Sequence, residues 1–380
     1  MIADGQDTSG VAEWHPRVVV CGTGFGRVYL SALRGPHMPF ELVGILGRGG
    51  ARSRACAEHY GVPLYTDVDD LPTVDIACVV VGAALNGGPG AQLAQRLMAR
   101  GCHVLQEHPL HHSELAACLR VARRSGVVYH LNAHYLHVDA VRRFLRAAGR
   151  LRQHQAPLFV DALTSVQVLY SLFDILTRAV GAVRPWSLSI VESRGGVLDS
   201  LHGTLGGVPL TLRVQNALDP AERDNGAHVT HRVTLAAEGG DLLLANAHGP
   251  VLWSPRLHMP PDYHGVITVA QSGATHLDLP ATEVIGPARG PSHREVIGEH
   301  WPRATARALR ELRRAILAGE DPLPGGQHHL ALCEMTARAM ALLGPPALRG
   351  AGTRPAAIEE AARLVVAAGA GTHADAREDS

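Results

Sequence analysis

Lysine is absent from this sequence: all 35 basic side chains of the 380-residue chain are arginines. The 41 glycines and the many alanines indicate a GC-rich coding sequence, which accounts for this bias. Arginine keeps its proton at any working pH, so it cannot act as an acid or a base. Any proton transfer that a lysine would carry out must therefore use another type of side chain here.

Cysteine is scarce and ungrouped. The six cysteines, at positions 21, 56, 78, 102, 118 and 333, form no C-x-x-C pair, so neither a disulfide framework nor a zinc site is predicted. Isolated cysteines in apolar runs fit a reducing cytoplasm, and the polar start MIADGQDTSG lacks the apolar core of a signal peptide. The longest apolar run, Val74 to Leu85, is too short to span a bilayer. We therefore expect a cytoplasmic protein.

An excess of charge of either sign is also absent, since 35 acidic residues balance the 35 arginines. A basic patch is what attracts nucleic acid or an anionic membrane, so neither is an expected partner. With 46% hydrophobic residues, the chain can build a full core over about two domains.

Short apolar runs alternate with helical patterns in the first third of the chain. The predicted strands are 17–21, 40–46, 74–82, 102–107 and 127–132. The predicted helices between them include 53–61, 91–101 and 113–126, the last with Ser113 as its cap. This spacing is typical of a doubly wound α/β fold with a parallel sheet, so we expect a Rossmann domain at residues 15–135.

Beyond about residue 155 the apolar residues alternate at period 2, which predicts a mostly antiparallel β-sheet. One helix, 170–180, interrupts the strands, and further helices are predicted at 301–318, 328–343 and 355–368. We assign residues 136–370 to an α+β domain whose last helices are expected to return to the Rossmann domain. Residues 371–380 are expected to form a disordered tail.

The first strand runs directly into a glycine-rich turn, CGTGFGR. Its glycines allow a tight turn and close approach to a pyrophosphate, and the helix that follows offers free N–H groups. Arg27 stands where G-x-G-x-x-G would have its third glycine, so an ordinary turn is the alternative. The position between the first strand and the first helix favours dinucleotide binding. The predicted contacts are Gly22, Thr23, Gly24, Phe25, Gly26 and Arg27.

The end of the second strand bears on the choice between NADPH and NADH. An NAD site usually places Asp or Glu there to hold the ribose 2′-hydroxyl, whereas this strand ends in GRGGARSR, without an acid. Arginine can bind a 2′-phosphate through paired, charge-assisted hydrogen bonds. We therefore predict NADPH, held by Gly47, Arg48, Arg52 and Ser53; the alternative is a solvated run of arginines.

Four stretches together resemble the Gfo/Idh/MocA oxidoreductases: GTGFGRVYLSAL, SRACAEHYGVPLYTDVDDL, VDIACVVV and HVLQEHPLHHSEL. The resemblance implies that the C-terminal sheet domain covers the nicotinamide and supports a homodimer. It also implies cofactor contacts at Gly82, after the third strand, and at Glu107 and His108 near the nicotinamide. The glycines that follow Gly82 could equally serve to start the next helix.

The sequence departs from this family at its catalytic residues. The usual E-K-P triplet reads Glu107-His108-Pro109, and the D-x-x-x-H-x-x-D helix, aligned on Asp174, has Gln167 and Ser171 in place of Asp and His. These losses argue against alcohol oxidation by the family's route.

One branch resembles the chain more specifically, through GVPLYTDVDDLP, HVLQEHPLHH, LNAHYLHV and GEHWPRA: the thiazolinyl imine reductases of siderophore biosynthesis. That resemblance implies reduction of the C=N bond of a thiazoline to a thiazolidine. It also implies that the substrate is a thioester on a carrier domain of a nonribosomal peptide synthetase.

Such a reduction needs a hydride at carbon and a proton at nitrogen. A histidine with an ordinary pKa of about 6.5 can donate near neutral pH, where lysine is a poorer acid. His108 follows the carboxyl end of a strand, which is where ligands bind in such folds. The resemblance carries the general-acid role onto His108 and Tyr135. The alternatives are a histidine that positions the nicotinamide and a tyrosine that packs.

Two other functions stay open at this point: an NADP-dependent dehydrogenase of another small substrate, and a catalytically silent NADP-sensing regulator. The 23 histidines form no metal motif, because HREVIGEH has the wrong spacing for H-E-x-x-H, so no catalytic metal is predicted.

Overall fold

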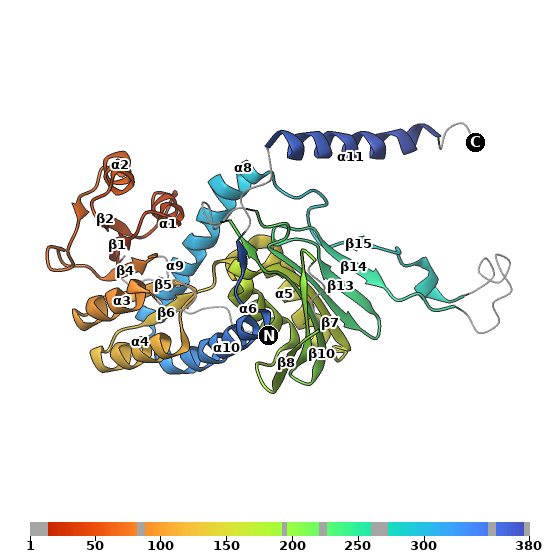
Figure 1. Cartoon of the computed structure of the whole chain (residues 1–380), viewed down its shortest axis with the longest axis horizontal. Helices are drawn as coiled ribbons and strands as arrows, with labels where there is room; N and C mark the ends of the chain where they lie inside the picture. The colour runs from red at the N-terminus through yellow and green to blue at the C-terminus, as the bar shows by residue number, and fades with distance from the viewer. Residues whose placement is uncertain are drawn as a thin grey trace, which may run out of the picture.

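The computed structural model describes residues 14–81, 88–191, 196–219, 226–259, 273–348 and 355–375. Two β-sheets organise the chain. In Figure 1 the first sheet and its helices lie on the left and the second sheet on the right, with α6, α9 and α10 between them.

The first sheet is parallel, with strand order β3-β2-β1-β4-β5-β6. Its strands are β1 (Arg17–Cys21), β2 (Glu41–Leu46), β3 (Leu64–Tyr65), β4 (Ile76–Val79), β5 (His103–Glu107) and β6 (Tyr129–Asn132). This is the doubly wound Rossmann order, so the predicted N-terminal fold is confirmed. β3 has no counterpart among the predicted strands, because two residues are too few to show a period.

Four helices connect these strands: α1 (Gly26–Leu33), α2 (Ala51–Tyr60), α3 (Pro89–Ala99) and α4 (His112–Ser125). The cap of α4 is His111, not the predicted Ser113. The His111 ring accepts a hydrogen bond from the Ser113 N–H, and Glu114 accepts one from the His111 N–H. Histidine is not among the usual N-cap residues, which is why the sequence favoured the serine.

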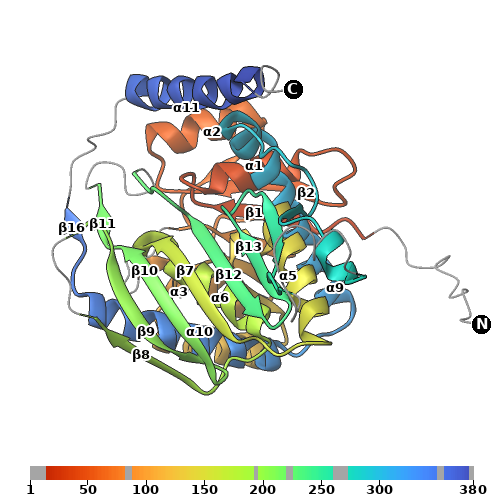
Figure 2. The same cartoon turned by 90° about the vertical axis from the view of Figure 1, so that its right-hand side faces the viewer.

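The second sheet has the order β15-β14-β13-β12-β7-β10-β9-β8, and its neighbours are antiparallel except β7 and β10. Its strands are β7 (Phe159–Ser165), β8 (Trp186–Ile190), β9 (Asp199–Leu205), β10 (Val208–Gln215), β12 (His231–Ala237), β13 (Gly240–Leu244), β14 (Val251–Pro255) and β15 (Glu283–Val284). The predicted mostly antiparallel sheet is thus confirmed. The run GVITVAQS, which predicts a further strand, lies outside the described residues. Figure 2 views the strands with α5, α6 and α10 behind them.

Four long helices follow the first sheet along the chain: α5 (Asp139–Arg152), α6 (Leu169–Val180), α9 (Trp301–Leu317) and α10 (Pro322–Leu343). Leu309 and Leu312 of α9 share a core with Leu30 and Leu33 of α1, and α10 packs on α4. α10 begins earlier than predicted, because the prolines and glycines of PLPGG suggest a loop. A small parallel pair, β11 (Ala217–Leu218) and β16 (Ala347–Leu348), adjoins the second sheet.

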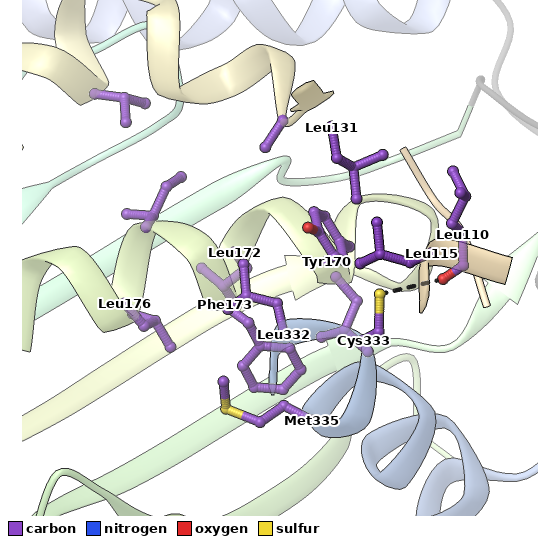
Figure 3. Packing of buried hydrophobic residues seen from close by; sticks show 14 of the residues in the cluster. Leu110, Leu115, Leu131, Tyr170, Leu172, Phe173, Leu176, Leu332, Cys333 and Met335 are labelled. Atoms are coloured by element: carbon purple, nitrogen blue, oxygen red, sulfur yellow. Dashed lines mark hydrogen bonds between the residues drawn. The ribbon is translucent and has the colours of Figure 1, made fainter. Parts of the chain in front are cut away.

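One hydrophobic core runs from the first domain into α6 and α10. Figure 3 shows Tyr170 and Phe173 of α6 near Leu110, Leu115 and Leu332 within this core. The thiol of Cys333 on α10 donates to the carbonyl oxygen of Leu110 at 3.4 Å. Since Leu110 follows His108 by two residues, packing of α6 and α10 fixes the segment that carries the histidine.

The last helix, α11 (Pro355–Asp375), differs from the rest because its described side chains are exposed. The helix extends to Asp375, and its alanine-rich sequence favours helix formation. Residues 376–380 lie outside the described part of the chain. No helix among the described residues is long and apolar enough to cross a membrane.

We predict that Leu332→Ala lowers the free energy of unfolding by about 2–5 kcal/mol, because it opens a cavity in the core shared by the two domains. Chemical denaturation would measure the change. Leu364→Ala on α11 is the control, since Leu364 is 66% exposed and its loss should cost little. Equal effects of the two substitutions would contradict the proposed packing.

Candidate active site

The turn after β1 has the geometry of a dinucleotide site. Gly22 has a φ of +97°, and a Cβ atom there would collide with the carbonyl oxygen of Val80. Gly24 faces open space, with nothing within 4 Å of a Cβ position. Gly26 begins α1, where a Cβ would lie 3.4 Å from the Val20 side chain. Tight turning, open approach and close helix packing are the three glycine roles in such sites, so the turn fits a nicotinamide dinucleotide.

The other residues of the turn face in different directions. Arg27 is exposed, and its Nε donates to the carbonyl oxygen of Gly24 at 3.2 Å. Thr23 is half-buried. The Phe25 ring lies edge-on to His134, with ring centroids 5.1 Å apart, and 5.8 Å from the Trp301 ring. Phe25 therefore turns toward the second half of the chain.

The end of β2 exposes arginines beside this turn. Arg48 and Arg52 are exposed, while Gly47 lies close to the side chain of Ser53. Ser53 is buried and its hydroxyl donates to the carbonyl oxygen of Gly50 at 2.9 Å. The two arginines can thus reach a ligand, whereas the serine hydroxyl is already engaged in holding the turn.

Glu107 ends β5 in a buried cluster of hydrogen bonds. Its Oε2 accepts from the Tyr29 hydroxyl of α1 and, at 3.0 Å, from the Asn132 amide of β6. The same amide also donates to the Tyr29 hydroxyl, at 2.6 Å. Burial raises the pKa of Glu107 to about 8, although the hydrogen bonds from Tyr29, Asn132 and the His134 N–H act to lower it. The carboxyl group therefore keeps its proton at neutral pH.

His108 is enclosed at the same strand end, with only 8% of its side chain exposed. Its ring stacks on Tyr170 of α6 at a centroid distance of 5.1 Å and an angle of 19°. Burial lowers the pKa of His108 to about 4, although Asp174 acts to raise it. The imidazole is therefore neutral near pH 7. The expectation of an ordinary histidine pKa is wrong, because α6 and α10 exclude water from this position.

Tyr135 lies in the short helix η1 (His134–His137), which follows β6. Its ring is edge-on to that of His231, the first residue of β12, at 4.6 Å. His231 is fully buried, within 3.2 Å of both the Thr164 and the Ser171 hydroxyl oxygens. It also lies within electrostatic range of His108. His231 is thus a neighbour of both predicted general acids, Tyr135 and His108.

The structure also explains how the site accommodates the lost family histidine. Ser171 of α6 stands at that sequence position, and its hydroxyl oxygen lies 3.2 Å from His231 Nε2. The imidazole of His231, from β12, therefore lies next to the position on α6 where the family has its histidine. Burial lowers the pKa of His231 to about 3, so this imidazole is neutral as well.

A second polar cluster lies behind the Tyr170 ring, and the sequence analysis identified only one of its members, Asp174. The Tyr170 hydroxyl and His329 Nδ1 are 2.7 Å apart, and His328 Nε2 lies 2.9 Å from a carboxylate oxygen of Asp174. Burial acts to raise the pKa of Asp174, but the hydrogen bond from His328 and the charge of Arg178 hold it below its usual range. The region behind Tyr170 therefore carries a buried negative charge.

Several other site residues also escaped the sequence analysis: Tyr29, Asn132, His231 and Trp301. Each is a single polar or aromatic residue within an otherwise ordinary helix, strand or loop, so no local pattern marks it. The stretch GEHWPRA was noticed for its resemblance. Its Trp301 begins α9, after α8 (His293–Glu295) and the π-helical turn η4 (Val296–His300), and lies beside the glycine turn.

Gly82, the remaining predicted cofactor contact, lies outside the described residues. Within the described part of the chain, no group of three or more His, Cys, Asp or Glu side chains could hold a metal ion.

Two family models match this chain. The model "Oxidoreductase family, NAD-binding Rossmann fold" of the Gfo/Idh/MocA group matches residues 16–133. The model "Thiazolinyl imine reductase Irp3-like, C-terminal" matches residues 155–254. The first domain of this chain belongs to the Gfo/Idh/MocA oxidoreductase family. Its second domain is of the thiazolinyl imine reductase type, so both predicted resemblances are confirmed. A search of curated protein sequences found no match.

Solved structures of similar fold cover most of the chain. UDP-N-acetylglucosamine 3-dehydrogenase GnnA from Acidithiobacillus ferrooxidans has a TM-score of 0.62 at 16% identity, covering 86% of this chain and 97% of its own. The 3-ketoreductase KijD10 from Actinomadura kijaniata, in complex with NADP, has a TM-score of 0.60 at 18% identity, covering 88% and 99%. GenD2 from gentamicin A biosynthesis, in complex with NAD, has a TM-score of 0.61 at 16% identity, covering 90% and 97%. At these identities the similarity shows the fold alone.

We predict that Gly22→Ala weakens nicotinamide dinucleotide binding about tenfold or more, since roughly 1–2 kcal/mol of backbone strain adds to the collision with Val80. Fluorescence titration of the reduced cofactor would measure the dissociation constant. Gly61→Ala is the matched control, because Gly61 also has a positive φ, +62°, but faces open space at the end of α2. It should lower stability and leave binding unchanged; an equal loss of binding in both variants would contradict the assignment.

Proposed function

We propose that this oxidoreductase uses NADPH to reduce the C=N bond of a thiazoline to a thiazolidine. The substrate would be tethered to a carrier domain of a nonribosomal peptide synthetase that assembles a siderophore. The observation that carries the proposal is His108, buried beside Glu107 where the family has lysine, in a chain whose second domain is of the thiazolinyl imine reductase type.

The residues at the site suit imine reduction better than alcohol oxidation. Bound NADPH supplies a hydride to the imine carbon. The protein has to orient the ring, exclude water and deliver one proton to the nitrogen. Oxidation of an alcohol needs a base that removes a proton. Glu107 holds a proton at neutral pH, the family's lysine is absent, and the neutral imidazole of His108 is a weak base because burial lowers its pKa to about 4. Tyr135, packed against His231, is the second proposed donor.

The choice of NADPH rests on Arg48 and Arg52. Both are exposed beside the glycine turn, and the segment from Gly47 to Ala51 carries no acid that would repel a 2′-phosphate. Guanidinium groups bind phosphate through paired, charge-assisted hydrogen bonds.

The carrier domain as partner, a homodimer and a cytoplasmic location belong to the same proposal. They follow from the thiazolinyl imine reductase type of the second domain and from cysteines that are unpaired and buried.

The proposal is tested by giving the purified protein NADPH and either a carrier-bound thiazolinyl thioester or a small thiazoline thioester. We expect NADPH oxidation to match formation of a product that has gained two hydrogens, measured by absorbance and mass spectrometry. Nucleotide sugars and polyols, with NADP⁺, are the comparison substrates. Turnover of those alone would indicate a dehydrogenase. Tight NADPH binding without turnover of any substrate would indicate a regulator.

We predict that Arg48→Ala narrows the preference for NADPH over NADH by roughly 10- to 100-fold, the range expected for losing charged hydrogen bonds of about 1.5–3 kcal/mol. The ratio of the two dissociation constants measures the effect. Arg100→Ala is the control, because Arg100 pairs with Asp69 on the surface. An unchanged ratio in Arg48→Ala would place the 2′-phosphate elsewhere.

A further inference from the structure

Glu107 and His108 are adjacent in sequence, and their side chains face each other. Oε1 of Glu107 lies 3.7 Å from Nε2 of His108. The other oxygen, Oε2, is held by the Tyr29 hydroxyl and the Asn132 amide. The backbone N–H of His134 also forms a hydrogen bond with the carboxyl group. Oε2 is thus fixed by two side-chain donors, while Oε1 faces the imidazole at a distance longer than a hydrogen bond, so proton transfer requires the two groups to move closer together.

The other ring nitrogen of His108, Nδ1, is in an unusual environment. Nδ1 of His108 is buried, and no described residue forms a hydrogen bond with it. An unmade hydrogen bond of a buried polar atom costs about 1–3 kcal/mol, so such an atom calls for a partner. Stacking on Tyr170 holds the ring plane, so Nδ1 points away from Glu107. A bound substrate nitrogen would satisfy this atom.

We infer that Glu107 stores the proton for the reduction and that His108 passes it across its ring to the substrate nitrogen. The inference rests on the proposed function for its substrate. It makes Glu107 a positioning residue that acts through His108, a role beyond its expected contact with the cofactor.

The transfer balances as a relay. The His108 Nδ1–H bond breaks as an N–H bond forms on the substrate, while the Glu107 O–H bond breaks as a new N–H bond forms at His108 Nε2. The imine carbon receives its hydride in the same reduction, so the C=N bond becomes CH–NH. The imidazole ends neutral with its proton on the other nitrogen, and Glu107 ends as a carboxylate. Uptake of one proton from water and return of the imidazole tautomer restore the starting state.

Several titratable groups from other elements surround this pair: Tyr29 of α1, His134 of η1, Asp174 of α6, His231 of β12 and His329 of α10. Burial dominates their combined effect, raising the pKa of Glu107 to about 8 and lowering the pKa of His108 to about 4. Below about 8 the carboxyl group carries its proton, and above about 4 the imidazole is neutral. The two states that the relay needs therefore coexist between these values.

The cluster also has a route for taking up its proton again. Asn132, which donates to Glu107, lines a cavity of about 460 Å³ that is also bounded by Glu320 and His329. The Glu320 side chain is 50% exposed, so this cavity reaches the surface. Water can thus approach the Asn132 side of the cluster, whereas the Tyr170 ring covers one face of the His108 imidazole.

Glu107→Gln is the first test, because glutamine keeps the shape but cannot release a proton. We expect kcat at pH 7 to fall by about 10²-fold or more, as for loss of an acid in proton transfer. The dissociation constant for NADPH should change much less than kcat, because glutamine keeps the shape of the side chain. In the unmodified protein kcat should fall as the pH rises through about 8, which gives the pH profile an alkaline limb. This limb should be missing from the pH profile of the variant. Glu58→Gln, on the exposed face of α2, is the control. An unchanged limb in Glu107→Gln would overturn the inference.

Tyr29→Phe is the second test, because its effect has a definite sign. The Tyr29 hydrogen bond lowers the pKa of Glu107, so its loss should move the alkaline limb of kcat to higher pH. A shift to lower pH, or none, would contradict the relay.

A measurement without substrate separates this inference from the proposed function. Difference infrared spectra against Glu107→Gln should show a protonated carboxyl band at pH 7 that disappears as the pH rises through about 8. If this band is present and no thiazoline is reduced, the proposed function fails while the proton store stands. If the carboxyl group is ionised at pH 7, the proton store fails even where thiazoline reduction succeeds.

Discussion

Exclusion of water from the carboxyl end of β5 is the constraint on which the rest of the site depends. The packing of α6 and α10 against the turn after this strand encloses His108, while Tyr29 and Asn132 enclose Glu107. A charged group loses its hydration in such a place, so the acid keeps its proton and the base stays neutral. The pair thus holds one transferable proton and no net charge, which suits a reaction that must protonate a nitrogen.

The site also shows how a family's catalytic set can be replaced through the tertiary structure. The lysine, aspartate and histidine of the sugar-oxidising members are absent from positions 108, 167 and 171. In their place, His108 occupies the end of β5, and the side chain of His231 from β12 lies beside Ser171. The replacements are neutral at pH 7, because burial lowers the pKa of both histidines. A cationic lysine site has thereby become a neutral one.

Much of the fold could be predicted from the sequence, because both sheets have simple periods. The buried runs of the first domain and the alternating strands of the second agree with the observed strands. The errors arose where local signals mislead. The PLPGG stretch lies inside α10 rather than in a loop, His111 caps α4 through a ring nitrogen, and the two-residue strand β3 has no detectable pattern. In each case a contact between distant segments or an uncommon cap outweighs the local preference.

The sequence by itself determined the two-domain architecture, the glycine turn, the arginines after β2 and the replacement of lysine by histidine at position 108. Those features depend on residue type and spacing, which a single chain displays. The tertiary structure alone decided which groups surround that histidine. Tyr29 and Asn132 meet Glu107 from separate elements of the first domain, while Tyr170 and His231 come from the second half of the chain. Protonation in the site depends on this enclosure, because a pKa is set by burial and neighbouring charges rather than by the residue alone.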